Sequence, residues 1–309
     1  MARLNVGNGG INMTDNSVTY GRLTSISPNA FEFSGDDGSR SVITGSFSIV
    51  NGQITGGTMQ SYTSYFSNGQ LNAQAINISI SLASYDSFVS RGDVKGFYQS
   101  IFAGNDIFSG GAGKDVFIET PGNDIVNGGD GTDTIVFDAG RSSYQIIRTG
   151  ATEFQVTRNG ATTAYSQIER VVFGDGAAFA LDADGAAGQA YRVYQAAFNR
   201  TPDKPGLSYW INAMDNGASL IDVAQGFVNS AEFKNLYGAA PTQTELVNQF
   251  YQNVLGRQGE TAGVNYWVSE LASGRQNVAQ VLAGFSESTE NQARIIGSIQ
   301  DGIPYTPFW

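Results

Sequence analysis

The sequence predicts a multidomain α+β protein, and three patterns within its 309 residues lead to this class. Apolar and small polar residues alternate over residues 1–85, a nine-residue period runs through 101–136, and a helical period begins near residue 186. We expect four parts in chain order: a β-rich amino-terminal domain over 1–100, a short parallel β-roll over 101–136, a β extension that caps the roll over 137–185, and an all-α domain of two tandem helical repeats over 186–309.

The first part alternates with a period of two, the period of a half-buried strand. Clear examples lie at residues 46–54 and 76–82. The pairs Asn51-Gly52 and Asn68-Gly69 are typical of tight hairpin turns. We therefore expect antiparallel strands joined by hairpins, followed by a short helix near residues 93–102 that shields the open edge of the roll.

The second part divides into four blocks of nine residues, IFAGNDIFS, GGAGKDVFI, ETPGNDIVN and GGDGTDTIV. The fourth position of every block is glycine, the sixth is aspartate and the eighth is apolar. Glycine-rich turns reach conformations with positive φ, and three residues are enough for a very short strand whose middle side chain points inward. Each block thus predicts half a coil of a flattened solenoid, in which blocks n and n+2 stack about 4.8 Å apart.

This stacking pairs the aspartates, Asp106 with Asp124 and Asp115 with Asp133. Carboxylates at that spacing repel each other unless a cation lies between them, and oxygen ligands suit calcium. We expect about two internal calcium sites, one at each edge of the roll, with room for another at an end. Asp130 is either a further ligand or a turn former. Main-chain carbonyls of the turns would complete the cages, and the candidates are Phe102, Gly104, Gly111, Gly113, Thr120, Gly122, Gly129 and Gly131.

The blocks resemble the RTX family, the haemolysin-type calcium-binding repeats with the consensus G-G-x-G-x-D-x-U-x. Blocks two and four match it fully over 110–115 and 128–133, whereas blocks one and three lack the first two glycines. The resemblance implies export by bacterial type I secretion machinery, which needs no cleaved amino-terminal signal. It therefore implies a secreted protein, extracellular or at the cell surface, whose folding is tied to millimolar calcium outside the cell.

The helical part contains a second repeat. The pair Tyr194-Gln195 recurs as Tyr251-Gln252, and Tyr209-Trp210 recurs as Tyr266-Trp267, both 57 residues later. The region over 186–309, most specifically its stretch over 194–210, resembles the DUF4214 family, a helical domain at the carboxy end of many RTX proteins that has no settled enzymatic activity. The kinds of proteins in which this domain occurs imply a role in assembly or surface attachment. We interpret the repeated aromatic residues as core, because such residues at helical spacing usually pack between helices.

The composition excludes several kinds of chemistry. The chain has no histidine and no cysteine, which rules out a Ser-His-Asp triad, a His/Cys zinc site, a thiol nucleophile and a disulfide. A net charge of −11 disfavours nucleic acid and anionic membranes as partners, and no stretch approaches eighteen apolar residues. A glycosidase that uses only carboxylates stays formally open, but residues 1–100 show no acid-and-base pair. We expect no enzymatic activity.

Two non-enzymatic functions remain. Low charge, strands rich in Asn, Ser and Thr, and a solenoid between two domains favour a secreted structural protein that self-assembles at or near the bacterial cell surface, as a filament, sheath or surface layer. Its main partner would then be itself, in a homopolymer. The alternative is an RTX adhesin whose β-rich domain binds a cell-surface glycan, with Tyr62, Tyr65 and Phe66 as the aromatic residues that stack on sugar.

Overall fold

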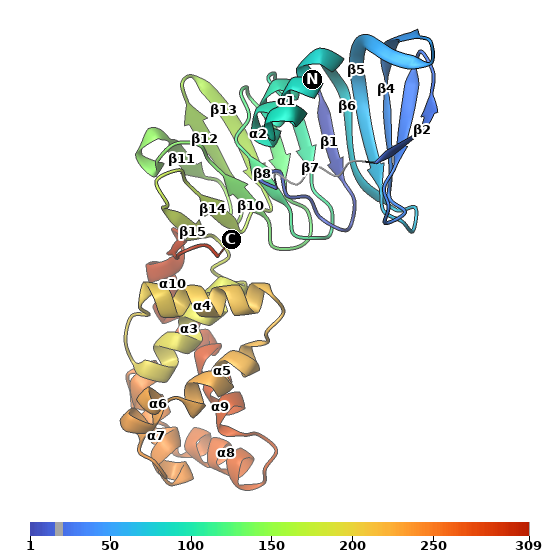
Figure 1. The fold of residues 1–309 in the computed structure, drawn as a ribbon. Coiled ribbons are helices and arrows are strands. Elements are labelled where there is room, and N and C mark those ends of the chain that lie inside the picture. The colour runs from blue at the N-terminus through green and yellow to red at the C-terminus, as the bar shows by residue number, and fades with distance from the viewer. Residues whose placement is uncertain (16–20, 309) are drawn as a thin grey trace. The chain divides into compact units, whose positions relative to one another are not determined.

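One sheet joins the amino-terminal strands to the nine-residue blocks. Within residues 1–15 and 21–308, which the computed structural model describes, the chain divides into two units, Met1–Ala177 and Ala178–Trp309. In the first unit eleven of the described strands form one sheet, in the order β11-β12-β13-β9-β7-β1-β6-β5-β4-β3-β2 (Figure 1). Residues 16–20 of the predicted β-rich domain and residue 309 of the predicted helical domain lie outside the described residues.

The amino-terminal strands are antiparallel, as their alternation predicts. They are β2 (Arg22–Ile26), β3 (Ala30–Ser34), β4 (Arg40–Val50), β5 (Gln53–Tyr65) and β6 (Leu71–Ser81). Asn51 and Gly52 join β4 to β5 with φ of 52° and 75°, the positive values that a two-residue hairpin turn needs. Asn68-Gly69 lies in the loop between β5 and β6.

Two helices follow these strands, although the sequence pattern predicts only one. The expected strand ends at Ser81, whose side chain accepts a hydrogen bond from the N–H of Ser84 and so begins helix α1 (Leu82–Arg91). Helix α2 (Val94–Ile101), which Asp93 caps, is the one predicted near residues 93–102. The predicted strand over 76–82 is therefore wrong at its last residue, because a local serine cap ends the alternation there.

The last three residues of each nine-residue block form a strand. These strands are β7 (Ile107–Ser109), β8 (Val116–Ile118), β9 (Ile125–Asn127) and β10 (Thr134–Val136). The pairs β7–β9 and β8–β10 are parallel, with Phe108 opposite Val126 and Phe117 opposite Ile135. All four of these side chains are buried. The eighth position of each block therefore fills the interior of the coil.

Segments outside the blocks continue the coil on both sides. Before the blocks, β1 (Arg3–Val6) pairs in parallel with β7, and Asn12 pairs with Val116. After the blocks, the parallel pairs are β13 (Ala161–Ser166) with β9 and β14 (Arg170–Val172) with β10. The remaining strands, β11 (Gln145–Arg148) and β12 (Phe154–Arg158), extend the large sheet by antiparallel pairing. The blocks are thus the middle of a longer coil.

The second unit is helical apart from a short antiparallel pair, β15 (Ala178–Ala180) with β16 (Ile303–Pro304). Its described helices are α3 (Ala186–Phe198), α4 (Lys204–Asp215), α5 (Leu220–Asn229), α6 (Ala231–Tyr237), α7 (Gln243–Leu255), α8 (Thr261–Ala272), α9 (Val278–Ser286) and α10 (Thr289–Ile299). Helices α3 and α7 begin and end 57 residues apart, as do α4 and α8. The later pairs, α5 with α9 and α6 with α10, begin 58 residues apart.

Two arginines that repeat 57 residues apart, Arg200 and Arg257, occupy equivalent places in this unit. Arg200 Nε lies 3.0 Å from Glu232 Oε1, and its guanidinium lies 5.1 Å from the centre of the Tyr194 ring. Its counterpart Arg257 pairs with Glu290 at 2.7 Å. Each arginine therefore links the end of one helix to a carboxylate of a later helix, which is a packing role.

We expect the packing of the repeated tryptophans to make helical glycines sensitive to substitution. A Cβ atom on Gly226 in α5 would lie 2.5 Å from the Trp210 ring, whereas one on Gly297 in α10 would meet nothing within 4 Å. Gly226→Ala should therefore destabilise the helical unit by about 1–3 kcal/mol, and the control Gly297→Ala should stabilise it by about 0.5–1 kcal/mol. Thermal melting at 222 nm measures both, and equal effects would contradict this packing.

Candidate metal centre

The four predicted aspartates lie in turns but are buried, with at most 3% of each residue exposed. The main-chain N–H of Asp106 donates to Asp124 Oδ1 at 2.9 Å, and the N–H of Asp115 donates to Asp133 Oδ1 at 2.8 Å. The structure thus brings the aspartates together in the two expected pairs. We call this stacked arrangement of carboxylates at the two edges of the coil the aspartate ladder.

The aspartate ladder continues beyond the blocks in both directions. On the amino-terminal side, the N–H groups of Ala2 and Ile11 donate to the carboxylates of Asp106 and Asp115. These donors are main-chain groups of a coil that has no carboxylate of its own at those positions. The only signal in the sequence is the nine-residue spacing of Leu4 and Met13, which are buried like the apolar residues of the blocks.

On the carboxy-terminal side, side chains of other types take the aspartate positions. The N–H of Asp124 donates to Thr163 Oγ1 at 3.3 Å, and the N–H of Asp133 donates to Glu169 Oε2 at 2.8 Å. Neither Thr163 nor Glu169 lies in a nine-residue block, so the sequence pattern missed both. One edge of the ladder therefore ends in a hydroxyl, and the other edge ends in a third carboxylate.

The turn glycines allow main-chain oxygens to stack closely. A Cβ atom on Gly122 would lie 1.8 Å from the Gly104 carbonyl oxygen, and one on Gly131 would lie 2.4 Å from that of Gly113. Gly122 and Gly131 also have φ of 131° and 125°, which side chains rarely adopt. Glycine is therefore required at the fourth position of the third and fourth blocks, whereas a Cβ atom on Gly104 in the first block would meet only the Asp106 carboxylate, at 3.9 Å. Four of the predicted carbonyl ligands lie at these stacked turns.

The other predicted carbonyl ligands have more varied surroundings. The Gly111 carbonyl accepts the N–H of Asp130 at 2.9 Å, and the Asp130 side chain is exposed. Gly129 stacks on Gly111, since a Cβ atom there would lie 2.2 Å from the Gly111 oxygen. The hydroxyl of Thr120 donates to Asp124 Oδ2 at 2.9 Å. Phe102 ends α2, and its buried ring packs in the core.

The donors of the aspartate ladder, carboxylate oxygens together with main-chain carbonyl oxygens, suit calcium better than a metal that needs ligands from side chains alone. Within the described part of the chain, no group of three or more acidic side chains is arranged to hold a metal ion. A cation in the aspartate ladder would therefore take carboxylate oxygens from Asp106 and Asp124, or from Asp115 and Asp133, together with main-chain carbonyl oxygens. Calcium accepts six to eight such oxygens in flexible geometry.

Burial makes the charged form of the ladder costly. Desolvation raises the pKa of Asp115, and it raises the pKa of Asp124 to about 6 and that of Asp133 to about 7. Hydrogen bonds from main-chain N–H groups lower these pKa values in part. The negative charges of Glu169 and Asp115 raise the pKa of Asp133 further. A divalent cation would remove this repulsion, so its binding would favour the folded coil.

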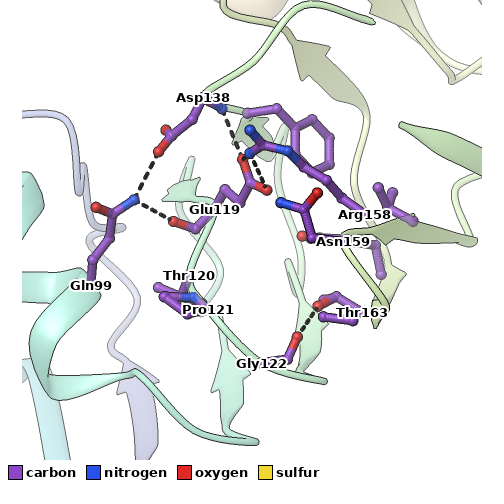
Figure 2. A pocket seen from close by; sticks show the side chains of 13 residues that line it. Gln99, Glu119, Thr120, Pro121, Gly122, Asp138, Arg158, Asn159 and Thr163 are labelled. Atoms are coloured by element: carbon purple, nitrogen blue, oxygen red, sulfur yellow. Dashed lines mark hydrogen bonds and ion pairs between the residues drawn. The ribbon is translucent and has the colours of Figure 1, made fainter. Parts of the chain in front are cut away.

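A cavity of about 280 Å³ lies beside the third block, between its turn and the β12–β13 hairpin (Figure 2). The Arg158 guanidinium pairs with Glu119 at 3.0 Å, and the Gln99 amide donates to Asp138 at 2.9 Å and to the Glu119 carbonyl at 3.1 Å. These polar groups of the cavity wall are paired with one another.

Two family models match the chain in the regions described above. The RTX calcium-binding nonapeptide repeat model matches residues 102–118 and 120–143, and the model of the domain of unknown function DUF4214 matches residues 189–237 and 224–295. The chain thus contains RTX repeats and a DUF4214 domain, as the motifs predict.

No curated protein matches the sequence. Among solved structures, the extracellular lipase LipA from Serratia marcescens is similar over a short stretch, with 20% identity and a TM-score of 0.15. The match covers 23% of this chain and 13% of the lipase chain. None of the described helices is long and apolar enough to cross a membrane.

Proposed function

We propose that this chain, with its RTX repeats and DUF4214 domain, is a secreted, non-enzymatic structural protein that calcium stabilises and that self-assembles at or near the bacterial cell surface. The polymer would be a filament, a sheath or a surface layer. Type I secretion machinery would export the chain, and further copies of the same chain would be its main partner.

The aspartate ladder is the observation that carries this proposal. Its carboxylates are buried and stacked in pairs, so they repel each other when they are charged without a cation. At the low free calcium of a cytoplasm the coil would remain unstable, whereas millimolar calcium outside would convert binding energy into folding energy. A protein of this kind folds after export and stays folded where calcium is plentiful.

The open sheet of the first unit supports self-assembly. Among the described strands, β2 at one end pairs with β3 only, and β11 at the other end pairs with β12 only. Four of the five residues of β2 are exposed, including Leu23 at 43%. An exposed edge strand offers main-chain groups to a strand of another chain, and a second copy is the partner available in a polymer.

A glycan-binding adhesin is the second candidate, and the cavity in Figure 2 is the observation that favours it. Two of the three aromatic residues expected to bind sugar have partners within the chain. Tyr62 hydrogen-bonds Ser41 at 3.1 Å, and the Arg40 guanidinium lies 4.6 Å from the centre of the Tyr65 ring. The cavity is therefore the better location for a glycan, but the pairing of its polar groups leaves the structural role as the stronger proposal.

Electron microscopy of the purified full chain, in millimolar calcium and in excess chelator, tests the proposal. We expect regular polymers in calcium that disperse on chelation. Leu23→Lys should suppress them, because a charge on an edge strand opposes pairing, while Val50→Lys at the exposed end of β4, inside the sheet, should not. Monomers in calcium that bind a glycan array would contradict self-assembly and support the adhesin.

A further inference from the structure

The turn that follows β13 stacks on the fourth block in the same way as the fourth block stacks on the second. The N–H of Asp115 donates to Asp133 Oδ1 at 2.8 Å, and the N–H of Asp133 donates to Glu169 Oε2 at 2.8 Å. The next N–H repeats the pattern, from Thr134 to the Asp115 carbonyl at 2.8 Å and from Arg170 to the Asp133 carbonyl at 2.9 Å. Glu169 therefore occupies an aspartate position of the ladder.

The carbonyl of Gln167 occupies the matching main-chain position. A Cβ atom on Gly110 would lie 1.7 Å from the Gly128 carbonyl oxygen and 2.5 Å from Asp115 Oδ2. One coil later, a Cβ atom on Gly128 would lie 2.0 Å from the Gln167 carbonyl oxygen and 2.4 Å from Asp133 Oδ2. A carbonyl oxygen and a carboxylate oxygen thus converge at both levels.

Gln167 reaches this position with a φ of 52°, in the left-handed region. Residues other than glycine, asparagine and aspartate rarely adopt that main-chain conformation, so the surroundings of Gln167 must hold it there. The turn between β13 and β14 is residues 167–169, three residues instead of the six that precede the strand of each nine-residue block. It contains no glycine and no aspartate. The turn is therefore equivalent to the turns of the blocks in geometry but not in sequence.

Asp133 has an oxygen without a partner at this end of the ladder. The residue is 0% exposed, and among the described residues Oδ2 has no hydrogen-bond partner. In the neighbouring turns, Asp115 Oδ2 accepts the N–H of Gly111 and Asp124 Oδ2 accepts the hydroxyl of Thr120, both at 2.9 Å. A buried carboxylate oxygen without a partner is costly, and such a group calls for a ligand.

We infer that Asp133, Glu169 and the main-chain carbonyl of Gln167 bind a further calcium ion between the fourth block and the turn that precedes β14. Two carboxylates and a carbonyl oxygen suit a hard divalent cation, and calcium tolerates the irregular geometry of unequal side chains better than magnesium does. The ion would neutralise the repulsion between Asp133 and Glu169 and satisfy the unpaired oxygen. It would also close the roll at the side where the nine-residue blocks end.

Glu169→Gln in the full chain tests this site, because glutamine keeps an acceptor for the Asp133 N–H but loses the charge. Glu153→Gln in the loop before β12 is the matched control. Equilibrium dialysis followed by elemental analysis counts the calcium ions bound per chain, below the melting temperature of each variant. We expect Glu169→Gln to bind one ion fewer than the wild type and the control. In calcium-free buffer it should melt at the wild-type temperature or higher, because a like charge beside Asp133 is gone.

An unchanged calcium number in Glu169→Gln would overturn this site and leave the proposed function intact. A lower melting temperature in calcium-free buffer, together with an unchanged calcium number, would assign Glu169 a structural hydrogen bond and likewise overturn the site. A wild-type chain that binds no calcium at all would contradict the aspartate pairs of the blocks as well, so the two failures are distinguishable.

Discussion

In millimolar calcium, the double variant Asp115→Ala with Asp133→Ala is expected to lose the calcium-induced folding of the roll. The substitutions remove both aspartates of the blocks from one edge, next to the paired strands β8 and β10. A site that is saturated 100-fold above its Kd contributes about 2.7 kcal/mol, so the loss should reach at least that size. Far-UV circular dichroism and the melting temperature, each with and without calcium, measure it.

The double variant Asp36→Ala with Asp86→Ala is the matched control, because it removes the same charge from exposed positions outside the ladder. This control should respond to calcium as the wild type does. If Asp115→Ala with Asp133→Ala keeps the full calcium response, these two aspartates are not calcium ligands.

The second large effect is a reversal of the pH dependence by calcium. In calcium-free protein, the pKa of Asp124 is about 6 and that of Asp133 about 7, above their ordinary value of 3.8. The folded state therefore holds more protons than the unfolded state between about pH 4 and pH 7, and the free energy of unfolding falls as the pH rises through that window. One pKa unit corresponds to about 1.4 kcal/mol, so the loss is on the order of a few kcal/mol.

Calcium binds the charged carboxylates, so in its presence stability should rise with pH over the same window. Melting temperatures between pH 4.5 and 7.5, in calcium-free buffer and in calcium, show both directions. The variant Asp124→Asn with Asp133→Asn isolates the contribution of these two groups. In calcium-free buffer it should melt above the wild type at pH 7.5 and near it at pH 4.5. A wild-type melting temperature that rises with pH without calcium would contradict the buried charges.

The nine-residue period predicted the pairing of the aspartates because block length and strand spacing together set the register. The same reasoning could not find Ala2 and Ile11, which contribute main-chain N–H groups that any residue carries. It also missed Glu169, because the shortened turn that positions it has neither the glycines nor the aspartate of a block. Local patterns thus predicted the middle of the coil, and long-range pairing determined its ends.

The sheet of the first unit shows the same limit. Alternation and the Asn51-Gly52 turn predicted the amino-terminal hairpins, since both signals lie within a few residues. The strand that joins those hairpins to the roll is β1, which pairs with β6 on one side and β7 on the other. These partners lie about 70 and 100 residues away along the chain, so no local period reveals them.

In the second unit the 57-residue spacing predicted where helices recur, because equivalent residues such as Tyr194 and Tyr251 repeat at that spacing, although the residues that begin the helices differ. The capping box of Thr242 and Glu245 begins α7, and that of Ser219 and Asp222 begins α5. The partners of the repeated arginines, Glu232 and Glu290, were less predictable, because each lies in a later helix and meets its arginine only after the helices pack.

Hydrogen–deuterium exchange of the full chain, with and without calcium, tests most directly whether calcium supplies the folding energy of the roll. We predict that the main-chain N–H groups of residues 101–136 exchange slowly in millimolar calcium and rapidly in calcium-free buffer at pH 7.5, whereas those of the helices in 186–299 stay protected in both. Equal protection of residues 101–136 with and without calcium would contradict the account.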